Sequence, residues 1–141
     1  MVIVMDCLFC KIISGEIPSS KVYEDESVYA FLDIAPSSIG HTLIMPKKHI
    51  ENFNEMSPED AASFFKSVNK IAKGVEKGVS ADGSNIGLNN GTVAGQEVPH
   101  VHIHLIPRYE SDGGGGMKSI VHTNPETDNL DEIAARIKDA F

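Results

Sequence analysis

Hydrophobic residues recur at a helical spacing in one long segment of the chain. From Ser57 to Lys77 the apolar residues fall three or four positions apart, which places them on one side of a helix. Ser57 fits the N-cap, Pro58 fits the first helical position, and Asp60 can reach back to the cap. This pattern predicts a long amphipathic helix with one buried face.

Two shorter segments show the same spacing less strongly. The sequence predicts a short helix from Cys7 to Ser14 with Asp6 as its cap. It also predicts a C-terminal helix from Leu130 to Ile137, which Asp128 or Thr127 would cap. The apolar side of this last helix can pack on the body of the protein or on a partner.

Between the helices, short runs rich in β-branched and aromatic residues predict five strands. These runs are Ser20 to Glu24, Val28 to Asp33, His41 to Met45, Ser84 to Asn90 and His100 to Pro107. Together the elements predict an α+β fold, with a five-stranded, largely antiparallel sheet and helices packed on it. We expect one domain over residues 1–110 and a C-terminal extension over residues 111–141, which contains a glycine loop and the last helix.

Composition and charge narrow the range of partners. The 141 residues include 12 Lys+Arg and 20 Asp+Glu, so the formal net charge of -8 argues against binding to duplex nucleic acid or an anionic membrane. The apolar run Met1 to Met5 is too short for the core of a signal peptide, and no later run has the length of a membrane span. Two cysteines are too few for the disulfide framework of a small secreted domain. We therefore expect a cytoplasmic protein.

Three of the six histidines lie within five residues, at His100, His102 and His104. Alternate side chains of a strand point to the same face, so the three imidazoles would share one face while the apolar residues between them pack under a helix. Three interpretations of this face are open. It is a solvated polar surface, a three-histidine catalytic metal site, or a site of nucleophilic and acid–base chemistry on an anionic substrate.

The run from His100 to Ile106 resembles the His-φ-His-φ-His-φ-φ signature of the histidine-triad (HIT) family, in which φ is apolar. Further segments agree with this family in order and spacing. They are Cys7 to Ile13 with Glu16 to Pro18, Gly40 to His49, and Gly95 to Val98. The chain is similar to the small, bacterial-type branch of this family that contains the Hint-like hydrolases.

The resemblance implies hydrolysis or transfer at the α-phosphate of a purine nucleotide or nucleoside phosphoramidate. The intermediate would be a nucleotidyl-histidine on the middle histidine, His102, because a neutral imidazole can attack phosphorus through one nitrogen when an acceptor holds the proton on the other. His100 and His104 complete the catalytic set, and His104 would stabilise charge on the phosphate oxygens.

The resemblance also implies a nucleotide-binding set, drawn from the end of the second strand and from the loop before the triad. The set is Phe31, Asp33, Ile34, Asn89, Gly95, Gln96, Glu97 and Val98. Phe31 and Ile34 would line the base pocket, and Asp33 would accept hydrogen bonds from the ribose hydroxyls. Glu97 stands where animal relatives often have serine, whose hydroxyl can pass a proton to the leaving group, so the leaving-group acid stays open.

Two thiolates and two neutral imidazoles form a charge-neutral tetrahedral site for Zn²⁺. The resemblance implies the ligand set Cys7, Cys10, His49 and His100. We expect this zinc to be structural, because four protein ligands leave no position for an activated water. Redox chemistry and unpaired thiols are the alternatives for the two cysteines.

Other functions and an oligomeric state also follow from the sequence. A dinucleoside polyphosphate hydrolase or a nucleotidyltransferase would need cations for additional phosphates, and Lys47, Lys48 and Arg108 are the nearby candidates. A zinc-stapled nucleotide-binding regulatory protein without physiological turnover is the alternative from another class. Dimers of the family join their sheets across a strand edge, so we expect a homodimer with the long helix at the interface.

Overall fold

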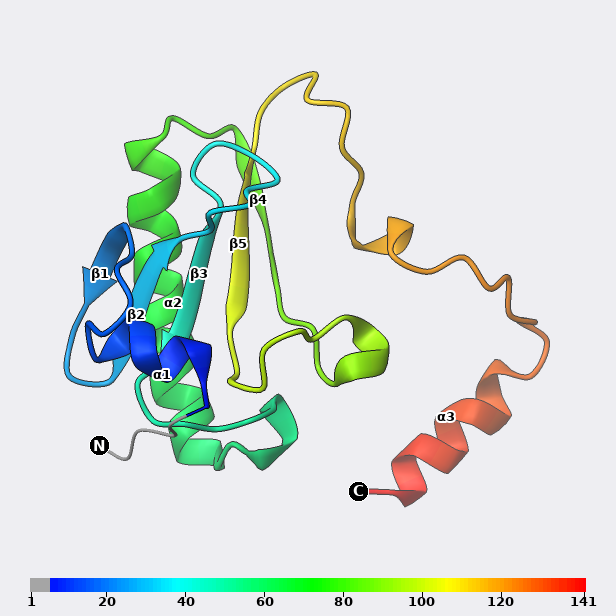
Figure 1. Ribbon diagram of the computed structural model, residues 1–141. Helices are drawn as coiled ribbons and strands as arrows, with labels where there is room; N and C mark the ends of the chain where they lie inside the picture. Colours follow the sequence, from blue (N-terminus) through cyan, green and yellow to red (C-terminus); the bar gives the residue numbers. More distant parts are fainter. Residues whose placement is uncertain (1–5) are drawn as a thin grey trace.

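The structure, a computed structural model, describes residues 6–141, so the apolar run Met1 to Met5 lies outside the described residues. Five strands form one antiparallel sheet in the order β1-β2-β3-β5-β4 (Figure 1). The strands are β1 (Lys21–Glu24), β2 (Val28–Leu32), β3 (Thr42–Pro46), β4 (Gly83–Gly87) and β5 (Ile103–Arg108). The helices are α1 (Leu8–Ile13), α2 (Pro58–Gly78) and α3 (Leu130–Asp139), with 3-10 turns at Phe53–Glu55, Thr92–Ala94 and Met117–Ser119. The predicted α+β fold is confirmed.

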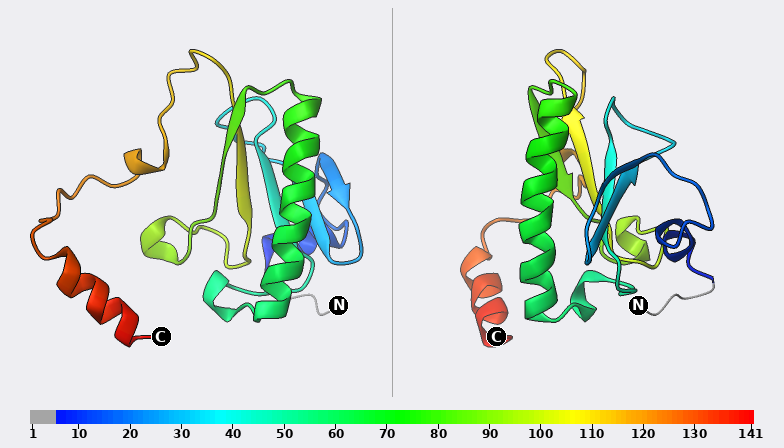
Figure 2. Two further views of the ribbon diagram at one scale, coloured as in Figure 1. Left: turned by 180° about the vertical axis from the view of Figure 1, so that it is seen from behind. Right: turned by 90° about the vertical axis from the view of Figure 1, so that its left-hand side faces the viewer.

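Helices α2 and α1 lie on opposite faces of the sheet (Figure 2). One core cluster joins the apolar face of α2 to Ala30, Ile44, Ile103 and their neighbours. A second cluster joins α1 to Phe31 and other residues on the opposite face. The face that carries the histidines is therefore not imidazole alone, because α1 covers part of it with apolar contacts.

Of the two predicted capping interactions at the start of α2, the structure contains the one made by Ser57. The Ser57 hydroxyl accepts a hydrogen bond from the Asp60 backbone N–H at 3.0 Å. The Asp60 carboxylate instead pairs with the Lys48 ammonium at 3.0 Å. In α1, the Cys7 sulfur rather than Asp6 caps the helix, because it accepts the Cys10 N–H at 3.4 Å.

Strand β5 begins later than the sequence predicts. It starts at Ile103, whereas His100 and His102 lie in the segment that leads into it. The Val101 N–H bonds to the Ile50 carbonyl in the loop after β3, at 2.7 Å. Pro46 ends β3 and has no N–H to donate, so the ladder between β3 and β5 reaches no further than Ile103.

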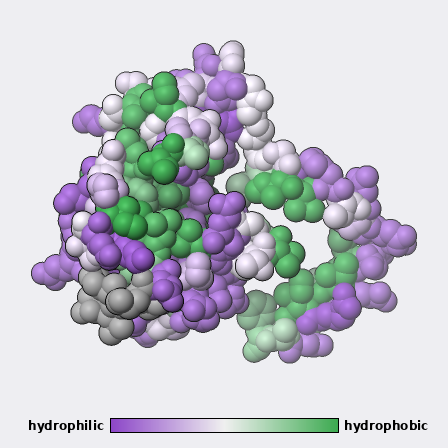
Figure 3. Space-filling model, in the orientation of Figure 1, coloured by the Kyte–Doolittle hydropathy of each residue, from purple (hydrophilic) through white to green (hydrophobic). Residues whose placement is uncertain are grey.

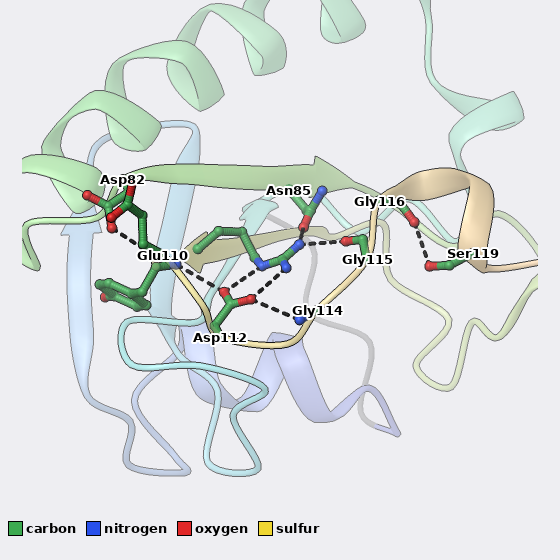
Figure 4. Close-up of polar contacts among 10 residues, drawn as sticks. Asp82, Asn85, Glu110, Asp112, Gly114, Gly115, Gly116 and Ser119 are labelled. Carbon is green, nitrogen blue, oxygen red and sulfur yellow. Dashed lines mark hydrogen bonds and ion pairs between the residues drawn. The ribbon is translucent and has the colours of Figure 1, made fainter.

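The C-terminal extension leaves the body through a network around Arg108, whose partners are drawn in Figure 4. The Arg108 guanidinium bonds to both Asp112 carboxylate oxygens, at 2.8 and 2.7 Å, and to the Asn85 side-chain oxygen at 2.7 Å. Gly114 lies so close that a Cβ there would be 2.2 Å from the guanidinium. The network fixes the point from which the extension departs.

Beyond this network the chain runs outward, and α3 lies apart from the sheet (Figure 1). No residue of α3 is buried, and Asn129 rather than Asp128 or Thr127 precedes its first turn, without a side-chain cap. Large apolar side chains stay exposed along the extension, as the hydrophobic surface in Figure 3 shows. Within residues 6–141, no helix combines the length and the hydropathy that crossing a membrane requires.

Candidate active site

A cavity of about 500 Å³ opens on the face of the sheet opposite α2. It lies between α1, the end of β2 and the loop that precedes the histidine run. The residues proposed from the sequence that line it are Phe31, Asp33, Ile34, Asn89, Gly95, Glu97, Val98, His102 and His104. Segments that are more than sixty residues apart in the chain therefore line the same cavity.

The His102 ring is held in a single tautomer by the backbone. Its Nδ1 lies 2.8 Å from the His100 carbonyl oxygen, which can only accept, so Nδ1 carries the proton. The Nε2 atom is then unprotonated, and it belongs to a ring that lines the cavity. Burial lowers the pKa of His102, and Phe9 packs edge-on against the ring with centroids 4.9 Å apart. The side chain is thus a ring in a fixed orientation, with the unprotonated Nε2 on the side that lines the cavity.

A chain of hydrogen bonds sets the tautomer of His104 in the same way. The Ser37 N–H donates to His41 Nδ1 at 3.0 Å, so the proton of a neutral His41 is on Nε2. This Nε2–H donates to His104 Nδ1 at 3.0 Å. His104 must then carry its own proton on Nε2. Burial lowers the pKa of both His41 and His104, which favours the neutral forms that this chain requires.

His100 does not line the cavity, since its side chain is 0% exposed. Its Nε2–H donates to the Pro46 carbonyl at 2.7 Å, and burial lowers its pKa to about 4. The carbonyl oxygen of the same residue holds the His102 proton. Of the predicted catalytic residues, His100 thus acts on the site through its backbone.

The loop before the histidines is fastened by the Gln96 side chain. Its amide accepts the Gly91 N–H at 2.9 Å and donates to the carbonyls of Glu51 and Val98, at 2.6 and 3.1 Å. Gln96 itself does not line the cavity. Gly95 has φ +98°, a left-handed conformation that favours glycine, and its backbone lies at the cavity wall. The loop is a preformed turn with its backbone near the histidines.

The other end of the cavity combines apolar and acidic groups. Phe31 is buried against Phe9, with ring centroids 5.8 Å apart, and Ile34 is 97% exposed at the rim. One Asp33 carboxylate oxygen accepts the Ala35 N–H at 2.8 Å, and the other lies 3.7 Å from His41 Nε2. Asp33 is therefore both a turn cap and a cavity residue.

Helix α1 contributes more to the cavity than the sequence suggested. Leu8, Phe9 and Ile12 form part of its wall, although we had assigned this helix only to the metal site. The apolar side of the helix was visible in the sequence, but nothing there indicated that Phe9 would lie against His102. His41, for which the sequence analysis gave no role, also lines the cavity and contacts His104.

The four predicted metal ligands come together at the edge of this site. The donor atoms of Cys7, Cys10, His49 and His100 all lie within 4.8 Å of one another. Individual sulfur to Nδ1 distances are 3.4 Å for Cys7–His100, 3.4 Å for Cys10–His49 and 3.6 Å for Cys10–His100. Ligands of a tetrahedral zinc with ordinary bond lengths are about 3.6 Å apart for a sulfur and a nitrogen. The donor set is compatible with zinc, because His100 also directs its unprotonated nitrogen to the sulfurs.

Comparison with known proteins finds similar sequences along most of the chain. The chain is 52% identical over 136 residues to an uncharacterized HIT-like protein of Methanocaldococcus jannaschii, which covers 94% of this chain and 98% of the relative. It is 42% identical over 113 residues to an adenosine 5'-monophosphoramidase of Schizosaccharomyces pombe, over 80% of this chain and 82% of the relative. An adenylylsulfatase of Arabidopsis thaliana is 45% identical over 107 residues, which span 76% of this chain and 54% of that protein.

Solved structures show the same fold. The crystal structure of a protein from Streptococcus mutans matches with a TM-score of 0.88 and 47% identity, over 97% of this chain and 86% of that one. A zinc-bound histidine triad family protein from Mycobacterium smegmatis matches with a TM-score of 0.74 and 34% identity, over 97% and 99% of the two chains. A family model described as HIT domain matches residues 14–111, so this chain belongs to the HIT domain family.

Proposed function

We propose that the protein hydrolyses nucleoside phosphoramidates at the α-phosphate, through a nucleotidyl intermediate on His102. One observation carries this proposal: the backbone carbonyl of His100 holds the proton on His102 Nδ1, which leaves Nε2 as the nucleophile. The phosphoramidase activity in the names of similar yeast proteins supports this chemistry.

The reaction would proceed in two displacements. His102 Nε2 forms a bond to phosphorus while the P–N bond breaks, and the departing nitrogen takes a proton from solvent in the open cavity. Water then attacks phosphorus, the bond from His102 Nε2 to phosphorus breaks, and the imidazole returns to its neutral form. Of the two protons of this water, one returns to solvent and the other converts the released ammonia to an ammonium ion. In sum, a phosphoramidate monoanion and one water give a nucleoside monophosphate dianion and an ammonium ion, so atoms and charge balance.

The other groups of the cavity would orient and stabilise the reacting phosphate. His104 offers its Nε2–H to a phosphate oxygen, and the backbone near Gly95 offers further N–H groups, as expected for charge that develops in a transition state. Phe31 and Ile34 would contact a purine base. Asp33, which keeps one oxygen away from its turn bond, would accept the ribose hydroxyls.

Replacing the nucleophile tests the proposal directly. His102→Ala should abolish turnover of adenosine 5'-monophosphoramidate and abolish the mass increase of one nucleotidyl group on the protein, while nucleotide affinity stays within about tenfold. His104→Ala should slow the reaction less. His122→Ala, in the exposed extension, serves as a matched control. If His102→Ala retained near wild-type turnover, another nucleophile would have to act.

Two alternatives make different predictions. A polyphosphate hydrolase needs cations near the site, but Lys47 pairs with Glu24 at 2.7 Å and Lys48 with Asp60. Neither lysine lines the cavity of the histidines, which disfavours this alternative. A nucleotide-binding regulatory protein would bind the nucleotide but turn over no phosphoramidate, so the same assay separates it from an enzyme.

We also propose that the Cys7, Cys10, His49 and His100 cluster holds a structural zinc. Three observations support this: the separations of the donor atoms, the fixed tautomer of His100, and the zinc named with the Mycobacterium smegmatis relative. Zinc would fasten α1, which walls the cavity, to the segments that flank β3 and β5. Its role would be to stabilise the fold, with four protein ligands and no reacting water.

A homodimer and a cytoplasmic location complete the proposal. Strand β4 is an edge of the sheet, and the extension exposes the apolar side chains of Ile120, Leu130 and Ile137. A second copy of the chain would cover both. Light scattering at micromolar concentration should therefore give about twice the chain mass of 15.2 kDa. A mass of one chain would contradict the dimer without affecting the proposed chemistry.

A further inference from the structure

We propose that Glu97 makes this site selective for substrates whose leaving group is positively charged, and that it disfavours anionic leaving groups. This inference rests on the proposed function, because it concerns the group that departs when His102 attacks phosphorus. The favoured substrates are phosphoramidates whose amine carries an ammonium group. The disfavoured substrates are mixed anhydrides that release sulfate or a polyphosphate.

The position of Glu97 follows from the loop that carries it. The neighbouring Gln96 side chain is tied to the backbone of Gly91, Glu51 and Val98 and takes no part in the cavity. Glu97 lines the cavity together with both reactive histidines. Among residues 6–141, no hydrogen bond or ion pair of the structure engages its carboxylate. The charge is thus carried by a fastened loop and is available to a ligand.

The charges around the cavity have a single sign. Of the described residues that line it, Asp33 and Glu97 are the acidic ones, and none is lysine or arginine. Asp33 is already engaged by the Ala35 N–H and lies near His41. The nearby cations are bound elsewhere: Lys47 and Lys48 line a different cavity beside α2, and Arg108 is held by Asp112. Among the described residues that line the cavity, no positive side chain therefore offsets Glu97.

The negative charge of Glu97 reaches the atoms that react. Glu97 lines the same cavity as His102 and His104, so its charge lies on the wall that surrounds the reacting groups. When the P–N bond breaks, the departing nitrogen takes one proton and leaves as a neutral amine, so the positive charge near Glu97 is that of the substrate's own second ammonium group, which the carboxylate attracts. Sulfate or pyrophosphate would instead depart with added negative charge beside this carboxylate, which repels it.

The size of the effect is limited because Glu97 is exposed to solvent. Solvent screens an exposed charge, so its effect on a charged leaving group is far smaller than that of a buried carboxylate. We therefore expect about a tenfold change for each class of substrate. The effect should shrink as salt is added.

The test compares three adenosine 5'-phosphate derivatives that differ in the leaving group. One releases a primary amine with a second, permanent ammonium group, one releases an uncharged amine of similar size, and one, adenylylsulfate, releases sulfate. Glu97→Gln keeps the shape of the side chain and removes its charge, whereas Glu97→Asp keeps the charge. Glu59→Gln on α2, across the sheet from the cavity, is the matched control.

We expect Glu97→Gln to lower kcat/KM for the ammonium-bearing substrate about tenfold relative to the uncharged one, and to raise kcat/KM for adenylylsulfate. Glu97→Asp should stay closer to the wild type, Glu59→Gln should match it, and the change should diminish at high salt. Equal effects on all three substrates, or a change in their ratios below twofold, would overturn the inference while the proposed function stands. If the wild-type protein hydrolysed none of the three, the proposed function and the inference would both be wrong.

Discussion

The hydrogen bond from His41 to His104 gives a prediction that can be developed quantitatively. His41 is 4% exposed, accepts the Ser37 N–H through Nδ1 and donates to His104 through Nε2, each at 3.0 Å. His41→Phe keeps an aromatic ring but removes both nitrogens. His104 would then be free to carry its proton on Nδ1, and its Nε2 could no longer donate to a phosphate oxygen.

Two separate losses follow from this substitution. Leaving the Ser37 N–H and His104 Nδ1 without their protein partners costs at most about 1 kcal/mol of stability for each, because Ser37 is exposed and His104 is half-buried, so water can replace part of each hydrogen bond. Losing one donor to the developing phosphate charge costs about 10²–10³ in kcat, equivalent to roughly 3–4 kcal/mol of transition-state stabilisation. We therefore expect kcat to fall by about a hundredfold or more, with nucleotide affinity nearly unchanged.

Two amide variants separate positioning from stability. The terminal group of Gln reaches the place of Nε2, so His41→Gln can restore the donor to His104. His41→Asn instead places its amide near the position of Nδ1, so it can accept the Ser37 N–H but cannot donate to His104. Steady-state kinetics, thermal melting and the ¹⁵N shifts of His104, which report its tautomer, form the assay. Turnover of His41→Phe within twofold of wild type, or no advantage of Gln over Asn, would refute the reasoning.

Three further predictions concern the metal, the pH dependence and the fold. Freshly purified protein should carry about one zinc per chain by elemental analysis. Cys7→Ser or a strong chelator should lower the unfolding free energy by about 3 kcal/mol or more. Metal-free protein of equal stability would exclude the structural site. His102 must be neutral to attack, and burial lowers its pKa from 6.5, so kcat/KM should fall as the pH is lowered with a midpoint below 6.5. A midpoint above 6.5 would contradict this. Ser57→Ala removes the N-cap hydrogen bond of α2, so it should lower the free energy of unfolding by about 1 kcal/mol in a denaturant titration and leave activity unchanged. An unchanged free energy of unfolding would show that this hydrogen bond contributes nothing.

Local patterns in the sequence predicted most of the sheet and the long helix, because α2 and the strands bury residues at regular spacings. They failed where distant contacts decide the conformation. The start of β5 depends on where Pro46 ends β3, and the bond from Val101 to Ile50 draws the preceding residues out of the ladder. No spacing within the histidine run contains that information.

The site was predictable to a similar extent. The histidine run pointed to His102 and His104 from the sequence, and both line the cavity. Phe9 packs against His102, and the Gln96 amide donates to the Glu51 carbonyl. Both contacts join segments that are remote in the chain, so local patterns could not predict them. The resemblance to a family supplied residue positions, but the tautomers had to come from hydrogen-bond partners.

The double use of His100 has a practical consequence for anyone who purifies this protein. Its ring belongs to the candidate zinc cluster, while its carbonyl oxygen orients the nucleophilic ring two residues later. A preparation with incomplete metal loading would then be a mixture of molecules with ordered and misaligned His102, and its specific activity would report occupancy as well as chemistry. If the cluster binds zinc as proposed, rate constants from different batches would become comparable only after they are divided by the fraction of chains that carry the metal.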